Sequence, residues 1–158
     1  MKKYLDAFPY LSVEQSLVIF RITLAGLFMA HAVMRFFEPH YFQHFGDFLA
    51  LRGVPFAHAV PYLATAIEIV GGTLLIFNKF ARWVALGLFG ISAGGIIIIH
   101  FRLGWFVGEW GEGGCEYSVA LCVMSLLMAA IDREKQKAKT MHSRQNSQSF
   151  LIAGVDAF

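Results

Sequence analysis

Four apolar stretches, each close to the length that crosses a bilayer, restrict the fold of this chain more than any other feature. They cover residues 17–37, 60–77, 83–101 and 115–131. About 20 apolar residues in a helix span a ~30 Å hydrocarbon core. The chain of 158 residues is 57% hydrophobic and 15% charged, whereas a soluble domain is about 25% charged. The sequence therefore predicts an all-α, multi-pass integral membrane protein, an up-down four-helix bundle.

The chain divides into one membrane domain, residues 1–131, and a polar tail, residues 132–158, of which we expect residues 132–149 to be mobile. Four spans place both termini on one side of the membrane. That side collects the basic residues Lys2, Lys3, Lys79, Arg82, Arg133, Lys135, Lys137, Lys139 and Arg144. By the positive-inside rule both termini are cytoplasmic, which places the protein in the cell inner membrane. Topology accounts for the basic residues, so the net charge of +2 does not indicate nucleic-acid binding.

The first outer loop, residues 38–59, is long enough to contain a helix. Apolar side chains recur there at helical spacing, at Tyr41, Phe42, Phe45, Phe48 and Leu49. This pattern predicts a short amphipathic helix over residues 41–51, in the membrane plane and over the outer end of the bundle. Earlier in the chain, Ser12 and Gln15 have the spacing of a capping box that opens the first helix.

Ionisable side chains within these spans are the strongest functional clue, because a charge in hydrocarbon is costly. They are Arg21, His31 and Arg35 on one face of the first helix, Glu68 in the second, and His100 and Glu116 at the outer ends of the third and fourth. The helical rise puts Glu68 between Arg21 and His31 in height. We therefore expect one of these two residues to pair with Glu68, in a polar column that rises to the outer surface.

Each of these residues also has a structural explanation. Arg21 can extend its side chain to the inner headgroups or form a purely structural pair with Glu68. His31 can be a buried core histidine bonded to a carbonyl. His100 and Glu116 can be the wetted ends of their helices. The sequence leaves these alternatives open.

Other patterns are weaker. His40 and His44 are four residues apart but lack an acidic or thiol neighbour, so no metal site is predicted. No flavin, haem or iron–sulfur motif is evident. Gly71 with Gly72, and Gly90 with Gly94, predict close helix packing.

Several short motifs, taken together and in order over residues 17–131, resemble the DoxX family. They are Arg21, His31 with Arg35, Gly53-Val54-Pro55, Glu68-Ile69-Val70-Gly71-Gly72, His100 with Gly104, and Gly114-Cys115-Glu116. Ala32 and Arg35 depart from the Gly and Lys common in the family. The resemblance implies a four-helix membrane bundle associated with redox work. Some relatives are subunits of a thiosulfate:quinone oxidoreductase, and others accompany thiol systems, oxidative-stress systems or enzymes that make copper-binding peptides.

The leading hypothesis is a redox subunit that binds quinone in the outer half of the bundle and works with a partner oxidoreductase. Imidazoles titrate near neutral pH, and a carboxylate can relay a proton. The predicted catalytic residues are His31, Glu68 and His100. The residues predicted to bind the cofactor are Arg21, Arg35 and Glu116. The alternatives are a non-enzymatic scaffold, a small-molecule carrier, or an accessory protein for the synthesis of metal-binding peptides; homo-oligomerisation is open.

Overall fold

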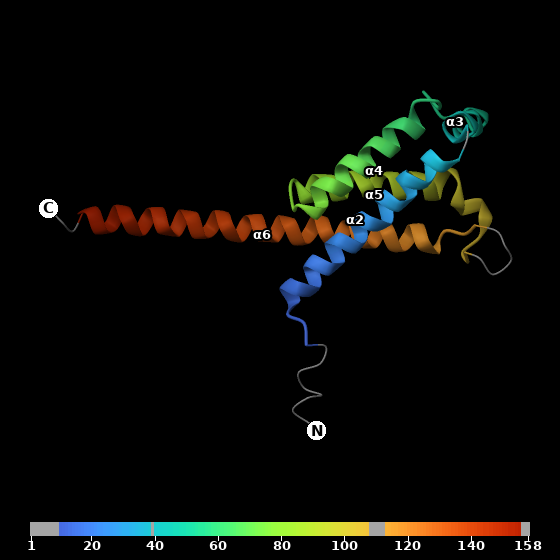
Figure 1. Ribbon diagram of the computed structural model, residues 1–158. Coiled ribbons are helices and arrows are strands. Elements are labelled where there is room, and N and C mark those ends of the chain that lie inside the picture. The colour runs from blue at the N-terminus through green and yellow to red at the C-terminus, as the bar shows by residue number, and fades with distance from the viewer. Residues whose placement is uncertain (1–9, 39, 108–112, 156–158) are drawn as a thin grey trace, which may run out of the picture.

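The computed structural model describes residues 10–38, 40–107 and 113–155, with side chains described as far as residue 147. This part of the chain contains helices and no strand, which confirms the all-α prediction. The elements are α2 (Val13–Phe37), α3 (Tyr41–Leu51), α4 (Val60–Ile76), α5 (Ala81–Ile98), the 3₁₀ turn η1 (His100–Leu103) and α6 (Glu116–Val155) (Figure 1).

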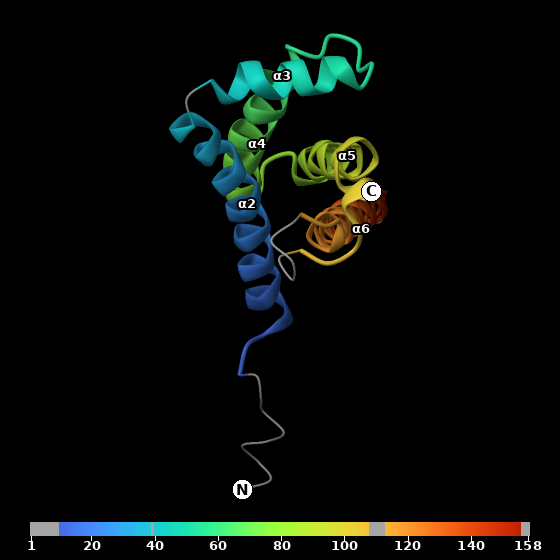
Figure 2. The ribbon, with the colours of Figure 1, turned by 90° about the vertical axis from the view of Figure 1, so that its right-hand side faces the viewer.

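The four long helices pack as two pairs. α2 lies along α4 and α5 lies along α6, and the two members of each pair run in opposite directions (Figure 1). In Figure 2 the view is nearly down the axes of α5 and α6, whereas α2 is seen from the side. The two pairs of helices therefore cross at a wide angle. In the same view α3 lies across the end of the molecule where α2 finishes and α4 begins.

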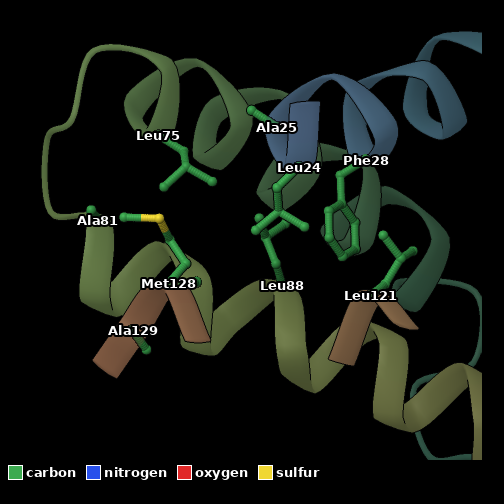
Figure 3. Close-up of a cluster of buried hydrophobic side chains, with 10 residues drawn as sticks. Leu24, Ala25, Phe28, Leu75, Ala81, Leu88, Leu121, Met128 and Ala129 are labelled. Atoms are coloured by element: carbon green, nitrogen blue, oxygen red, sulfur yellow. The ribbon is translucent and has the colours of Figure 1, made fainter. Parts of the chain in front are cut away.

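Apolar side chains from all four long helices meet where the two pairs cross. Leu24 and Phe28 of α2, Leu75 of α4, Leu88 of α5 and Leu121 of α6 belong to this cluster (Figure 3). The outward faces of the helices are also apolar, with exposed Ile22, Val70, Trp83, Ile97 and Val123. Helices that are hydrophobic on every side are typical of a membrane environment.

Two helices in the described residues, α2 and α5, are long and apolar enough to cross a membrane. The apolar helix α4 has 17 residues and is somewhat shorter than that limit. α2 begins with the capping box expected at Ser12, whose hydroxyl accepts the Gln15 N–H while the Gln15 amide oxygen accepts the Ser12 N–H.

The helix predicted in the loop between the first two spans is confirmed as α3, over the residues expected. Leu49 is buried, and Phe42, Phe45 and Phe48 are partly buried. Gly46 brings the α3 backbone against the segment before α4, because a Cβ at Gly46 would lie 2.4 Å from His58 Nδ1. α3 is therefore packed on the bundle by a close backbone contact.

The tail after residue 131 is helical, because α6 continues to Val155 and projects well beyond the other helices (Figure 1); its expected mobility stays a prediction. Residues 132–147 contain no Gly or Pro and are rich in helix formers. The Glu134 carboxylate accepts hydrogen bonds from Arg133 Nε at 3.1 Å and Lys137 Nζ at 3.3 Å. Such pairs stabilise an exposed helix modestly.

The glycines behave differently from one another. A Cβ at Gly72 would lie 2.5 Å from Met29 Cγ, and one at Gly71 would lie 3.2 Å from Val84 Cγ1. This confirms the predicted close packing of α4 on α2 and α5. The same prediction is wrong for Gly90 and Gly94 of α5, where an added Cβ would meet nothing within 4 Å. These two glycines leave an open space in the molecule.

Candidate functional site

The open space is a cavity of about 850 Å³, bounded by residues of α2, α3, α4, α5 and α6. Its walls are mainly apolar, with Phe28, Phe45, Phe48, Leu63, Ile67, Ile91, Ile98 and Leu121 among the lining residues. The lining residues His31, Leu63 and Gly90 are exposed, so the cavity opens at the surface of the molecule. Its volume falls in the range typical of small-molecule sites.

An ion pair between Arg35 of α2 and Glu68 of α4 forms a polar part of the wall. Arg35 Nη1 donates to Glu68 Oε2 and Nη2 donates to Oε1 at 3.2 Å. Nη1 also donates to Thr65 Oγ1 at 3.0 Å, and that hydroxyl donates to the Pro61 carbonyl at 2.8 Å. The two charged side chains are only 12% and 3% exposed. A two-point contact of this kind is the strong form of an arginine–carboxylate interaction.

The prediction that Glu68 faces the interior beside a basic residue is confirmed, but the choice of Arg21 or His31 as its partner is wrong. Side chains on a helix tilt toward its N-terminus. Because α2 and α4 run in opposite directions, Arg35 and Glu68 tilt toward each other, whereas Arg21 tilts away from Glu68. Arg21 does not line the cavity, and no described residue makes a hydrogen bond with its Nε.

Both predicted histidines line the same cavity as the ion pair. The His31 ring lies 5.6 Å from the Tyr117 ring of α6, centroid to centroid, and His31 is exposed. His31 is therefore not a buried core histidine. The His100 ring folds back over α5, with Nε2 at 3.7 Å from where a Cβ of Gly95 would lie. The structure thus brings His31, Arg35, Glu68 and His100 around one space.

Glu116 lies beside the cavity and is not among the residues that line it within the described chain. Its Oε1 accepts the Val107 N–H at 3.0 Å, and its own N–H donates to the Trp105 carbonyl at 3.0 Å. Val107 does line the cavity. Glu116 therefore holds the segment after η1 against the start of α6.

Several lining residues were not singled out from the sequence. Thr65 could have been predicted from the sequence, because it is a polar residue one turn before Glu68 on the same face of α4. Gly87, Gly90 and Gly94 also share one face of α5, at helical spacing. Tyr117 and Ser92 carried no signal of their own, since a lone Tyr or Ser in an apolar helix is unremarkable.

The long apolar helices, the apolar outer faces and the buried ion pair together define an α-helical membrane protein with an internal ligand-sized cavity. The model of the DoxX family matches residues 16–101, more than half of the chain, and the protein belongs to the DoxX family. The matched region includes Arg35, Glu68, His100 and the cavity-lining glycines of α5. Neither a curated protein nor a solved structure matches the chain.

Proposed function

We propose that this protein is a multi-pass inner-membrane subunit that binds a quinone in the cavity and works with a partner oxidoreductase. The observation that carries the proposal is the buried Arg35–Glu68 pair on the wall of an otherwise apolar cavity that is open at the surface. A polar cluster inside an apolar chamber suits a ligand with a small polar head and a long apolar tail. A quinone is such a ligand.

The hydrogen-bonding capacity of the cluster supports this choice. A guanidinium has five N–H donors, and the contacts of Arg35 with Glu68 and Thr65 use three of them. The remaining donors, together with the His31 imidazole, are available to a quinone carbonyl. The isoprenoid tail would lie against the aromatic and aliphatic walls and leave where exposed Leu63 marks the opening.

Reduction of a quinone to a quinol takes two electrons and two protons. In this proposal the partner oxidoreductase supplies the electrons. His31 and His100 carry protons between the cavity and its surroundings, because imidazoles exchange protons near neutral pH. Glu68 holds the Arg35 guanidinium in place through their ion pair, so that its remaining N–H donors stay at the cavity wall.

The proposed orientation has both termini in the cytoplasm. The exposed basic residues of α6 lie beyond residue 132, at the opposite end of the molecule from α3 and η1 (Figure 1). Under the positive-inside rule this end is cytoplasmic, so the cavity lies in the outer half of the bundle.

Filling the cavity without disturbing the fold gives a direct test. Gly90 and Gly26 are both exposed glycines within helices, and an added Cβ would meet nothing within 4 Å at either position. Gly90 lines the cavity and Gly26 does not. Leucine is favoured over glycine in a helix by up to ~1 kcal/mol, so neither Gly90→Leu nor Gly26→Leu should lower the stability.

We expect Gly90→Leu to weaken the binding of a short-chain quinone at least tenfold, measured by calorimetry on protein in lipid nanodiscs. Gly26→Leu should leave the affinity unchanged. Equal affinities for the two variants, or no quinone binding by the wild-type protein, would overturn the proposal.

A further inference from the structure

Ser92 of α5 has a buried hydroxyl without a hydrogen-bond partner in the part of the chain that the structure describes. Four other helical hydroxyls, those of Thr65, Thr73, Thr140 and Ser147, donate to the carbonyl four residues earlier. Ser92 is 6% exposed, and its Oγ makes no such bond. Ser92 is also one of the residues that line the cavity. An unpaired buried donor is unfavourable, and a ligand that accepts from it removes that penalty.

A second polar group without a partner among the described residues lies on η1, against Gly95 of α5. His100 Nδ1 is buried and has no hydrogen-bond partner within residues 10–38, 40–107 and 113–147. The Cδ2–Nε2 edge of the ring faces Gly95, so Nδ1 lies on the edge directed away from α5. Gly95 stands one turn after Ser92 and has no side chain to separate the serine from the histidine. Both residues line the cavity.

Four glycines of α5 lie on the cavity wall near these two groups. Gly87, Gly90, Gly94 and Gly95 leave helix backbone open to the cavity, with the side chains of Ile91 and Ile98 on the same wall. A planar ring can lie against such a surface. Arg35 and Glu68 belong to α2 and α4, whereas Ser92 and His100 belong to α5 and η1, so the cavity has polar groups on two separate sets of helices.

We infer that Ser92 and His100 form a second polar subsite, which binds the distal oxygen of a planar ligand whose first oxygen is bound near Arg35. The inference rests on the proposed function and narrows it to ligands with two opposed carbonyl oxygens. The seryl hydroxyl reaches its acceptor by turning between staggered positions about one bond. A lipid with a single polar end would leave this subsite unpaired.

The experiment compares Ser92→Ala with Ser125→Ala. Ser125 of α6 is the matched control. Its hydroxyl is also fully buried and has no partner among the residues described, but it does not line the cavity. The two probes are a short-tailed naphthoquinone and the corresponding tetralone, which keeps the fused carbon skeleton and one carbonyl. Binding is measured in nanodiscs, and thermal unfolding is measured without ligand.

We expect both variants to unfold at or above the wild-type temperature, since each loses an unpaired hydroxyl. Ser92→Ala should weaken naphthoquinone binding about five- to tenfold, the value of roughly one hydrogen bond, and change tetralone binding less than about twofold. Ser125→Ala should change neither affinity.

Three results would overturn the second subsite while leaving the quinone cavity intact. They are equal weakening of both probes by Ser92→Ala, no weakening of either, and a fall in the unfolding temperature that shows a structural role for the hydroxyl. If the wild-type protein binds neither probe, the proposed function itself fails, and this inference fails with it.

Discussion

Arg35 and Glu68 are 33 positions apart in the sequence and form a two-contact ion pair that fixes α2 against α4. A second contact between the same helices is consistent with this pairing. Gly72 lies one turn after Glu68 on α4, and it packs on Met29, which lies nearly two turns before Arg35 on α2. Together the two contacts define the register of α2 against α4. A buried carboxylate and a buried guanidinium stabilise each other, because either charge alone would be unfavourable in an apolar interior. The same contact therefore aligns two helices and provides the charged part of the cavity wall.

Removing one partner should be much worse than removing both. Arg35→Met leaves Glu68 buried without a counter-charge, and loss of one partner of a buried pair costs about 3–5 kcal/mol. In the double variant Arg35→Met with Glu68→Leu, no charge is left unpaired, so most of that stability should return. Thermal and denaturant unfolding in detergent measures both effects. If the losses of stability in Arg35→Met and in Glu68→Leu simply add in the double variant, the two residues are not energetically coupled.

Hydrophobic period and helix geometry were enough to predict the helical class, α3 and a basic partner for Glu68. They were not enough to choose Arg35 over Arg21. The helical rise gives only the heights of Cα atoms, whereas contact depends on side-chain direction, which reverses between antiparallel helices. The arginine side chain is also long enough to reach a residue well below its own Cα.

The glycines show a second limit of sequence reasoning. Gly72 and Gly90 look alike in an apolar helix, yet one packs against Met29 and the other faces the cavity. Whether a glycine packs against a neighbouring helix or faces the cavity depends on how the helices are rotated and how they cross. No local sequence pattern encodes this arrangement. The unpaired hydroxyl of Ser92 is likewise a property of its surroundings and not of its residue type.

Gly72 should tolerate no side chain unless Met29 is shortened. A Cβ would lie 2.5 Å from Met29 Cγ and 2.8 Å from its Sδ. We expect Gly72→Ala to lower the stability by about 1–3 kcal/mol, the usual range for overpacking. Adding Met29→Ala should recover part of the loss in an unfolding experiment. An unchanged stability of Gly72→Ala would show that α2 and α4 are not in the close contact described here.

Packing of α3 on the bundle should depend on Gly46. A Cβ there would clash with the His58 ring and lie 3.0 Å from the His58 Cα, which is backbone and cannot rotate away. We expect slow amide exchange over residues 41–51 in the wild-type protein and fast exchange in Gly46→Val, measured by mass spectrometry. Fast exchange in the wild-type protein would identify α3 as a mobile segment and remove it as a wall of the cavity.

The proposed orientation predicts the outcome of reporter fusions. A fusion after residue 131 should report a cytoplasmic location, and an insertion between residues 105 and 107 should report an external one. The physical reason is the concentration of Lys and Arg around α6 beyond residue 132. An external reporter after residue 131 would reverse the topology and place the cavity in the inner half of the membrane.

The two histidines should matter for binding more than for folding. His31 is exposed and His100 is partly buried, so replacing either with alanine removes a hydrogen-bonding group and little packing. We expect His31→Ala and His100→Ala each to weaken quinone binding about five- to tenfold, as expected for one lost hydrogen bond, with small shifts in unfolding temperature. Binding in nanodiscs and thermal unfolding are measured on the same samples.

Phe28→Ala is the matched comparison for these variants. Phe28 also lines the cavity but is 2% exposed in the core, and its truncation should cost about 3–5 kcal/mol of stability. Comparison with Phe28→Ala therefore distinguishes a loss of quinone binding caused by unfolding from a loss caused by removal of a group that contacts the quinone. If the two histidine variants unfold as readily as Phe28→Ala and show no separate loss of affinity, the histidines are structural, and the proposed proton transfer at the quinone loses its carriers.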